Sequence, residues 1–150
     1  MKISLILPAK NEAEGLRQAL PGVRRLLPDA EIIVVDDGST DETAEVARSY
    51  GATVLRSPYS MGNGAAIKRG ARAATGDILV FMDADGQHNA ALIPKLLARL
   101  DQGFDMVVGA RGWGDQASVG RGVANGMYNW VASLMTGFVV ADLTSGFRVV

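Results

Sequence analysis

The chain has 150 residues, of which 48% are hydrophobic and 21% are charged, and 15 basic against 16 acidic residues give a formal net charge of -1. A chain of this size and composition can bury one domain core, which argues against a disordered protein. The near-neutral charge argues against sequence-independent binding of nucleic acid, so no nucleic-acid partner is expected. Because the chain has no cysteine and one histidine, disulfide scaffolds, thiolate zinc sites, cysteine nucleophiles and multi-histidine metal sites are excluded.

Short apolar runs alternate along the chain with segments whose apolar residues recur at helical spacing. The runs are continuously apolar, which is typical of parallel strands that are buried on both faces. We therefore predict an α/β fold of the Rossmann-like type, with a mainly parallel sheet, helices on both faces and a single domain. The predicted strands are residues 3–7, 31–35, 52–55, 78–82 and 105–108, and the predicted helices are residues 12–27, 41–50, 63–74 and 90–100.

Local signals also bear on where the helices begin and how they run. Ser39 and Glu42 have the spacing of a capping box, in which each side chain accepts a backbone N–H at the start of a helix. Pro21 lies inside a predicted helix and is expected to kink or split it, because proline removes one of the helix hydrogen bonds. Pro94 lies near the start of another predicted helix, where it can occupy the first turn.

Ligands of parallel α/β sheets bind beyond the carboxyl ends of the strands, so residues that directly follow a strand are candidate site residues. Acidic residues follow the first, second and fourth predicted strands, and we expect them to gather at one edge of the sheet. They are Glu12, Asp36, Asp37, Asp83 and Asp85.

Asp83 and Asp85 are the candidates for a metal site. In extended backbone, residues two apart point the same way, and a turn at Gly86 would bring Gln87 beside Asp85. Such oxygen ligands suit Mg²⁺ or Mn²⁺, which takes its remaining ligands from water and substrate phosphates. The alternative is that these carboxylates cap the helix that begins near residue 89.

Asp36 and Asp37 end the second predicted strand, where nucleotide-binding folds place a carboxylate against a ribose or a base. The alternative is that they cap the following helix. Residues 61–64 open the third predicted helix as a phosphate-cradling loop does, although they match neither the Walker spacing nor the dinucleotide fingerprint. Lys68 on that helix is a candidate ligand contact, with a solvated surface lysine as the alternative.

The last third of the chain carries two arginines and an uncharged stretch. Arg111 follows the fifth predicted strand and Arg121 lies beyond a glycine-containing segment; both could clamp phosphate oxygens, with surface arginine as the alternative. Residues 122–141 contain no charged residue. Their polar and apolar residues fall on separate faces, which predicts an amphipathic helix that packs on the domain or lies against a membrane surface, in preference to a membrane span.

Both ends of the chain carry an expectation. Pro8 interrupts the first apolar run too early for a signal peptide or a membrane span, so we expect a cytoplasmic protein. The uncharged stretch at 122–141 adds the expectation that the protein lies at the cytoplasmic face of the membrane. The chain stops at Val150 within an apolar run, which indicates that the C-terminal part of a longer domain is absent.

The order and spacing of these motifs resemble those of the family 2 glycosyltransferases of the GT-A fold, in particular the dolichyl- or polyprenyl-phosphate mannose and glucose synthases. The resemblance covers essentially the whole chain. Its landmarks are Leu7-Pro8-Ala9-Lys10-Asn11-Glu12, Val34-Val35-Asp36-Asp37-Gly38-Ser39-Thr40-Asp41, Gly62-Asn63-Gly64-Ala65, Met82-Asp83-Ala84-Asp85-Gly86-Gln87-His88, Gly109-Ala110-Arg111 and Asp142-Leu143-Thr144-Ser145-Gly146-Phe147-Arg148.

The resemblance implies a donor site and a metal site. Lys10 departs from the family pattern, in which an aromatic residue usually stands at that position. The nucleoside of a nucleotide sugar would be held by Pro8, Ala9, Glu12 and Asp37, and the donor-binding set that we predict also includes Asn11, Asp36, Gly62 and Lys68. The sugar diphosphate and the metal would be held by Asp83, Ala84, Asp85 and Gln87, with Asp85 and Gln87 as direct ligands of the metal and Asp83 beside them.

The resemblance also implies an acceptor site. Arg111 and Arg121 match positions that grip an acceptor phosphate, and residues 113–120 match an acceptor loop. Asp142 is the candidate base if the acceptor is instead a sugar hydroxyl, which must lose a proton. The predicted catalytic residues are therefore Asp85, Arg111, Arg121 and Asp142.

The function that follows is transfer of a mannose- or glucose-type sugar from a GDP- or UDP-linked donor to a polyprenyl or dolichyl phosphate, with Mg²⁺ or Mn²⁺ and with inversion. A glycosyltransferase that uses a soluble or polysaccharide hydroxyl and a non-catalytic nucleotide-sugar-binding module are the alternatives. A phospho-accepting signalling domain fits less well, because its acid pair would follow the first strand. A sugar-1-phosphate nucleotidyltransferase would need a glycine-rich basic loop there.

Overall fold

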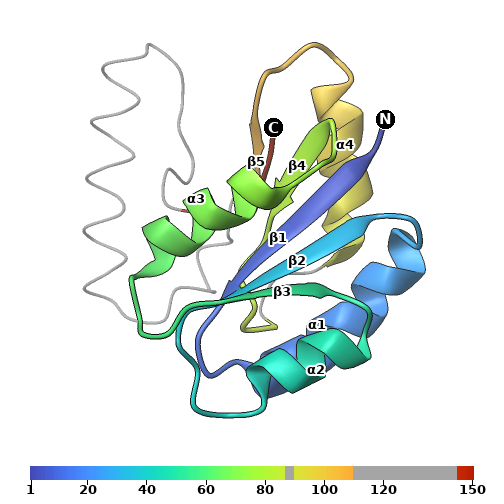
Figure 1. The fold of residues 1–150 in the computed structure, drawn as a ribbon. Coiled ribbons are helices and arrows are strands. Elements are labelled where there is room, and N and C mark those ends of the chain that lie inside the picture. Colours follow the sequence, from blue (N-terminus) through green and yellow to red (C-terminus); the bar gives the residue numbers. More distant parts are fainter. Residues whose placement is uncertain (87–89, 110–144) are drawn as a thin grey trace, which may run out of the picture.

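The computed structural model describes residues 1–86, 90–109 and 145–150 (Figure 1). Their centre is a six-stranded sheet in the order β3-β2-β1-β4-β6-β5. The strands are β1 (Ile3–Ala9), β2 (Glu31–Asp36), β3 (Thr53–Arg56), β4 (Ile78–Phe81), β5 (Val107–Val108) and β6 (Arg148–Val149), and the helices are α1 (Ala13–Leu26), α2 (Thr43–Ser49), α3 (Asn63–Ala73) and α4 (Ile93–Leu100), which a short 3-10 turn, η1 (Ala90–Leu92), precedes.

The sheet is parallel through its first four strands and antiparallel at one edge. β1 pairs in parallel with both β2 and β4, and β2 pairs in parallel with β3. β6 pairs antiparallel with β4 and with β5. The predicted mainly parallel sheet is therefore confirmed, and each predicted strand is present with bounds that differ by up to two residues. Strand β6 was not among the predicted strands, because two residues carry no periodicity.

Two apolar clusters, one on each face of the sheet, form the core. Because side chains of a strand alternate between faces, Leu5 and Leu7 of β1 pack into the cluster that α1, α2 and α4 cover, whereas Ile6 packs into the cluster under α3. In Figure 1, α1 and α2 lie side by side and α3 crosses the opposite face of the sheet. The prediction of helices on both faces is confirmed.

The structure corrects two of the expectations about helices. Helix α1 continues through Pro21 to Leu26, so the expected split is absent. Leu20 and Val23, on either side of this proline, are completely buried, and their packing offsets the roughly 3 kcal/mol that an interior proline costs a helix. Pro94 lies in the first turn of α4, as expected.

The predicted capping box at Ser39 is wrong. Helix α2 begins later, at Thr43, and its start has no capping bond from the Glu42 side chain, which instead accepts a hydrogen bond from Arg17 at 2.7 Å. The Asp41 carboxylate accepts the Thr43 N–H at 3.0 Å. Ser39 is used elsewhere, because its hydroxyl oxygen accepts the backbone N–H of Asn11 at 2.9 Å.

No helix within the described ranges is long and apolar enough to cross a membrane. The predicted amphipathic segment, residues 122–141, lies outside those ranges.

Candidate functional site

A cavity of about 420 Å³ opens at the carboxyl ends of β1, β2 and β4, the edge of the sheet at which the sequence places acidic residues. Four of the five predicted acids line it, and the fifth, Asp36, does not. The lining residues are Pro8, Ala9, Lys10, Glu12, Asp37, Ser60, Gly62, Asn63, Ala66, Asp83, Ala84 and Asp85. We refer to this space as the donor cavity.

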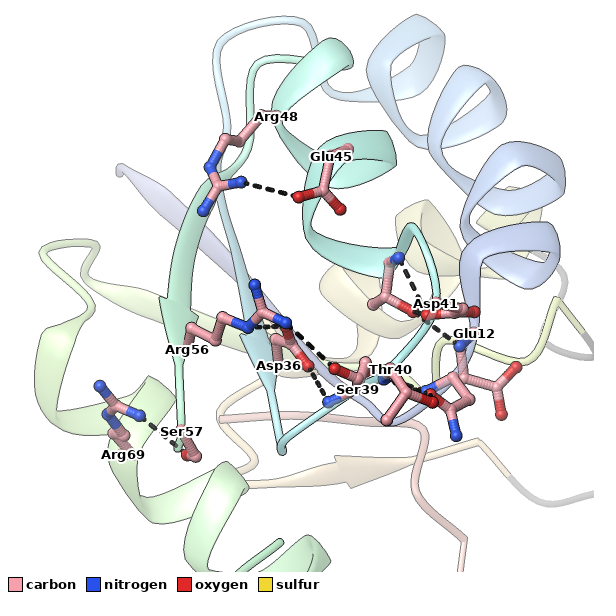
Figure 2. A network of polar contacts seen from close by, with 12 residues as sticks. Glu12, Asp36, Ser39, Thr40, Asp41, Glu45, Arg48, Arg56, Ser57 and Arg69 are labelled. Carbon is pink, nitrogen blue, oxygen red and sulfur yellow. Dashed lines mark hydrogen bonds and ion pairs between the residues drawn. The ribbon is translucent and has the colours of Figure 1, made fainter. Parts of the chain in front are cut away.

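The loop that leads from β1 into α1 is fastened to the loop that leads from β2 into α2 (Figure 2). The backbone N–H of Glu12 donates to the Thr43 hydroxyl at 2.9 Å, and that of Ala13 donates to the Asp41 carboxylate at 3.2 Å. These donors belong to the first turn of α1, which has no capping side chain of its own. The second βα loop therefore holds the first, and with it one wall of the donor cavity.

Asn11 completes this fastening and does not line the donor cavity. Its φ of 55° is left-handed, a conformation that asparagine tolerates better than most residues. Its amide oxygen accepts the N–H of Thr40 at 2.8 Å. The structure thus gives Asn11 a bond to the second loop and does not bring it to the predicted donor site.

Asp36 is completely buried and also lies outside the donor cavity. Its Oδ1 accepts the Ser39 N–H at 2.8 Å, and its Oδ2, which has no hydrogen-bond partner, lies 3.3 Å from Nε of Arg56. Arg56 in turn donates to the carbonyl oxygen of Ser39 at 3.1 Å (Figure 2). The structure thus gives Asp36 an ion pair with Arg56 and does not bring it to the donor cavity, because neighbouring residues of extended backbone point to opposite sides.

Asp37 points into the donor cavity and orders the loop before α3. Its carboxylate accepts hydrogen bonds from the N–H of Met61 at 2.7 Å, the Ser60 hydroxyl at 2.7 Å and the N–H of Gly62 at 2.9 Å. These bonds, the one from Met61 first, hold the pKa of the Asp37 carboxyl below its ordinary value. Asp37 thus fixes Ser60 and Gly62, two further lining residues.

Asp83, Ala84 and Asp85 follow β4 and also line the donor cavity. Two glycines let other segments approach them closely. A Cβ atom at Gly15 of α1 would lie 2.2 Å from the carbonyl oxygen of Ala84, and one at Gly146 would lie 2.4 Å from Oδ2 of Asp83. The segment 83–85 therefore packs closely against Gly15 and Gly146, where any side chain would collide with it.

The pKa of Glu12 reflects the negative charge around the donor cavity. Burial first, and then the nearby negative charges of Asp85, Asp41 and Asp83, raise the pKa of the Glu12 carboxyl above its ordinary value. An acidic cavity of this kind attracts a cation and repels a free anion.

Asp83 and Asp85 carry carboxylate oxygens, which are ligands of the kind that Mg²⁺ and Mn²⁺ prefer. Within the ranges that the structure describes, no three histidine or acidic side chains form a complete metal-binding cluster. A divalent ion held there would therefore draw part of its coordination from water or from substrate phosphates, which is the usual way in which Mg²⁺ is bound.

Of the predicted donor-site residues Gly62 and Lys68, the first lines the donor cavity and the second does not. Gly62 precedes the first residue of α3, with a left-handed φ of 91°, and lines the donor cavity. Lys68 lines a neighbouring cavity and not the donor cavity. Asn63, within the predicted loop 61–64, lines the donor cavity as well. Sequence reasoning missed Ser60 and Ala66 as lining residues, and only their position beside that loop hinted at them.

Several predicted site residues lie outside the described residues. They are Gln87, Arg111, Arg121, Asp142, the acceptor loop at 113–120 and the uncharged stretch at 122–141.

Comparison with known proteins gives a consistent family. A model described as glycosyl transferase family 2 matches residues 4–148. An uncharacterized glycosyltransferase of Mycobacterium bovis is 40% identical over 89% of this chain and 56% of its own length. An undecaprenyl-phosphate mannosyltransferase of Micrococcus luteus is 33% identical over 99% of this chain and 65% of its own length.

Among solved structures, the fold matches glucosyl-3-phosphoglycerate synthase of Mycobacterium tuberculosis in complex with Mn²⁺ and UDP-glucose. The TM-score is 0.78 at 30% identity, over 99% of this chain and 55% of that protein. The chain thus spans little more than half the length of the first relatives that it matches.

Proposed function

The chain belongs to glycosyl transferase family 2, and from this premise we propose that it is a metal-dependent glycosyltransferase that takes a hexose from a nucleoside-diphosphate sugar. The observation that carries the proposal is the donor cavity itself. It brings Asp37 and its loop at the end of β2 together with Asp83 and Asp85 at the end of β4. A nucleotide sugar needs both a nucleoside subsite and a cation that offsets its diphosphate charge.

The two ends of the donor cavity suit the two ends of such a donor. Pro8, Ala9 and Asp37 would line the nucleoside end, with Lys10 where a stacking aromatic residue is usual. Asp83 and Asp85 would hold Mg²⁺ or Mn²⁺ with the diphosphate, and the metal would stabilise negative charge on the departing nucleoside diphosphate. The Mn²⁺ and UDP-glucose in the glucosyl-3-phosphoglycerate synthase structure support this arrangement.

For the acceptor we propose a polyprenyl phosphate. The similarity to an undecaprenyl-phosphate mannosyltransferase supports it. A phosphate acceptor is already anionic, so it needs orientation and no general base, and Arg111 and Arg121 are the residues that we propose for that task. Contact with the cytoplasmic face of a membrane through residues 122–141 belongs to the same proposal.

A second acceptor is favoured by a specific observation. A structure of glucosyl-3-phosphoglycerate synthase, similar to this chain at a TM-score of 0.78 and 28% identity, is in complex with phosphoglyceric acid. A small phosphorylated carboxylic acid is therefore the competing acceptor.

The first experiment measures thermal stability of the chain with GDP, UDP, GDP-mannose and UDP-glucose, each with Mn²⁺ and again with EDTA. A ligand at about 100 times its Kd adds about 2.7 kcal/mol, or about 5–10 °C for a domain of this size. We expect a shift with one base only, present with Mn²⁺ and absent with EDTA. No shift with any nucleotide would contradict the proposed donor site.

Asp85→Ala tests the metal end of the donor cavity, with Asp29→Ala at an exposed acid far along the chain as the control. We expect Asp85→Ala to remove the Mn²⁺-dependent shift and Asp29→Ala to keep it. Transfer is then assayed with polyprenyl phosphate and with 3-phosphoglycerate. Product that partitions into the organic phase supports the lipid acceptor, and aqueous product supports the alternative.

A further inference from the structure

A second cavity, of about 310 Å³, adjoins the donor cavity. Asp37 and Ala66 line both, whereas its other lining residues are its own: Ser57, Met61, Ala65, Lys68, Arg69 and Arg72. We call it the basic cavity. The proposed function uses none of its three cationic side chains.

The three cationic side chains of the basic cavity repel one another, which lowers the stability of α3. Lys68 and Arg72 are four residues apart on α3, and Arg69 and Arg72 are three apart, so like charges lie on neighbouring positions of one helix face. Such pairs destabilise a helix by roughly 0.2–0.5 kcal/mol each. Within residues 1–86, 90–109 and 145–150, none of the three forms an ion pair with an acidic side chain.

One of these cations is held in place by a buried hydroxyl. Nη1 of Arg69 donates to Oγ of Ser57 at 2.9 Å, and Ser57 is only 4% exposed (Figure 2). The N–H of Ser57 is itself bound to the carbonyl oxygen of Asp36 at 2.8 Å, at the end of β2. The Arg69 guanidinium is thereby oriented before any ligand arrives, and among the residues that the structure describes its other N–H groups have no acceptor, so they can donate to an anion.

The acid in the wall offsets only part of the positive charge. Asp37 accepts three hydrogen bonds from Ser60, Met61 and Gly62, which favour its ionised form, so one negative charge stands against the three cations. The remaining wall, from Met61, Ala65 and Ala66, is apolar and adds no further charge.

We propose that the basic cavity is an anion site for a phosphate group, separate from the donor cavity. Lys68, Arg69 and Arg72 supply the positive charge, with the guanidinium geometry that phosphate oxygens favour. This site goes beyond the proposed function and does not depend on it, because the acidic donor cavity repels a phosphate that carries no metal. The phosphate belongs to a soluble molecule or to a lipid headgroup.

The experiment uses the full chain in EDTA, so that no metal draws phosphate into the donor cavity. Binding of inorganic phosphate is measured by ³¹P line broadening, and binding of phosphatidylglycerol vesicles by co-sedimentation, with phosphatidylcholine vesicles as the blank. The variant is Lys68→Gln with Arg72→Gln. Its control, Arg25→Gln with Lys95→Gln, removes the same charge from two exposed residues elsewhere.

We expect the Lys68/Arg72 variant to bind at least about tenfold more weakly and the control to stay within about twofold of the parent. Loss with inorganic phosphate assigns a soluble ligand, and loss with phosphatidylglycerol alone assigns a lipid headgroup. Failure of the parent to bind either probe, or equal losses in variant and control, would overturn the proposal. Donor binding with Mn²⁺, measured in parallel, tests the proposed function separately.

Discussion

Two acid pairs follow buried parallel strands in this molecule, and they have opposite surroundings. Asp36 and Asp37 end β2 and accept hydrogen bonds from the chain's own backbone N–H and hydroxyl groups. Asp83 and Asp85 follow β4, line the donor cavity together and act as negative charges on Glu12. Of the first pair only Asp37 lines the cavity, where it orders the loop before α3, whereas both acids of the second pair line the cavity and add negative charge beside Glu12.

Position relative to the strand accounts for the difference. Asp36 is the last residue of β2, and because adjacent residues of extended backbone point to opposite sides, it does not face the same space as Asp37. Asp83 and Asp85 both lie beyond the last residue of β4, in a segment of which Ala84 lines the donor cavity as well. Two acids near a strand end therefore share a cavity when both lie beyond the last residue of the strand.

The largest expected effect comes from removing Arg56, the ion-pair partner of Asp36 in the first pair. Arg56→Ala leaves the Asp36 carboxylate buried without an ion-pair partner, and we expect a loss of about 3 kcal/mol in the free energy of unfolding. Arg48→Ala is the matched control, because Arg48 and Glu45 are both exposed and 3.7 Å apart, and should cost less than about 0.5 kcal/mol. Urea denaturation measures both free energies of unfolding.

The same pair offers a rescue. Adding Asp36→Asn to Arg56→Ala removes the buried charge but keeps an oxygen for the Ser39 N–H. We expect the double variant to be more stable than Arg56→Ala alone. If the double variant is no more stable, the buried charge is not what makes Arg56 important.

A smaller effect is expected where α1 approaches the second pair. Gly15→Ala puts a methyl group 2.2 Å from the Ala84 carbonyl oxygen, so α1 or the Asp83–Asp85 segment must shift, at about 1–3 kcal/mol. The shift should also weaken Mn²⁺-dependent nucleotide binding. Gly22→Ala in the same helix meets nothing within 4 Å and should stabilise by about 0.5–1 kcal/mol. Equal effects of the two substitutions would show that close approach at Gly15 does not seat the acidic segment.

The smallest effect concerns Glu12, whose carboxyl pKa is raised by burial and then by nearby acids that include Asp85 and Asp83 of the second pair. Because the pKa of its carboxyl is raised on folding, the ionised form costs stability at neutral pH, and that cost disappears as the pH falls below the ordinary value of 4.5. We expect Glu12→Gln to stabilise the metal-free chain at pH 7 and to lose this advantage near pH 4. Thermal melts across this range measure it, with Glu14→Gln as the control for net charge. A variant no more stable than the parent at pH 7 would contradict the assignment.

The fold could be predicted largely from the sequence, because its signals are local. The continuously apolar run of β1 and the helical spacing of α1 can be recognised from the residues of each segment alone. Helix α1 forms despite Pro21, because Leu20 and Val23 are buried in the core. β6 escaped because two residues have no period, and its place in the sheet depends on pairing with β4.

The site was less accessible to sequence reasoning, because its supports join distant residues. Nothing near Ser39 in the sequence indicates that its hydroxyl serves Asn11, which lies 28 positions away. Nothing in the sequence indicates the close approach of Gly15 to Ala84 either. The alternation of extended backbone was available, and it would have separated Asp36 from Asp37.

The fastening between the first two βα loops has a consequence for how the chain folds. The N–H groups of Asn11, Glu12 and Ala13 donate to acceptors on residues 39–43, so the start of α1 is completed by the next βα unit. A helix whose first turn depends on a later segment gains little by forming early. We therefore expect the amides of α1 and α2 to exchange with solvent as one cooperative unit, which opens and closes together.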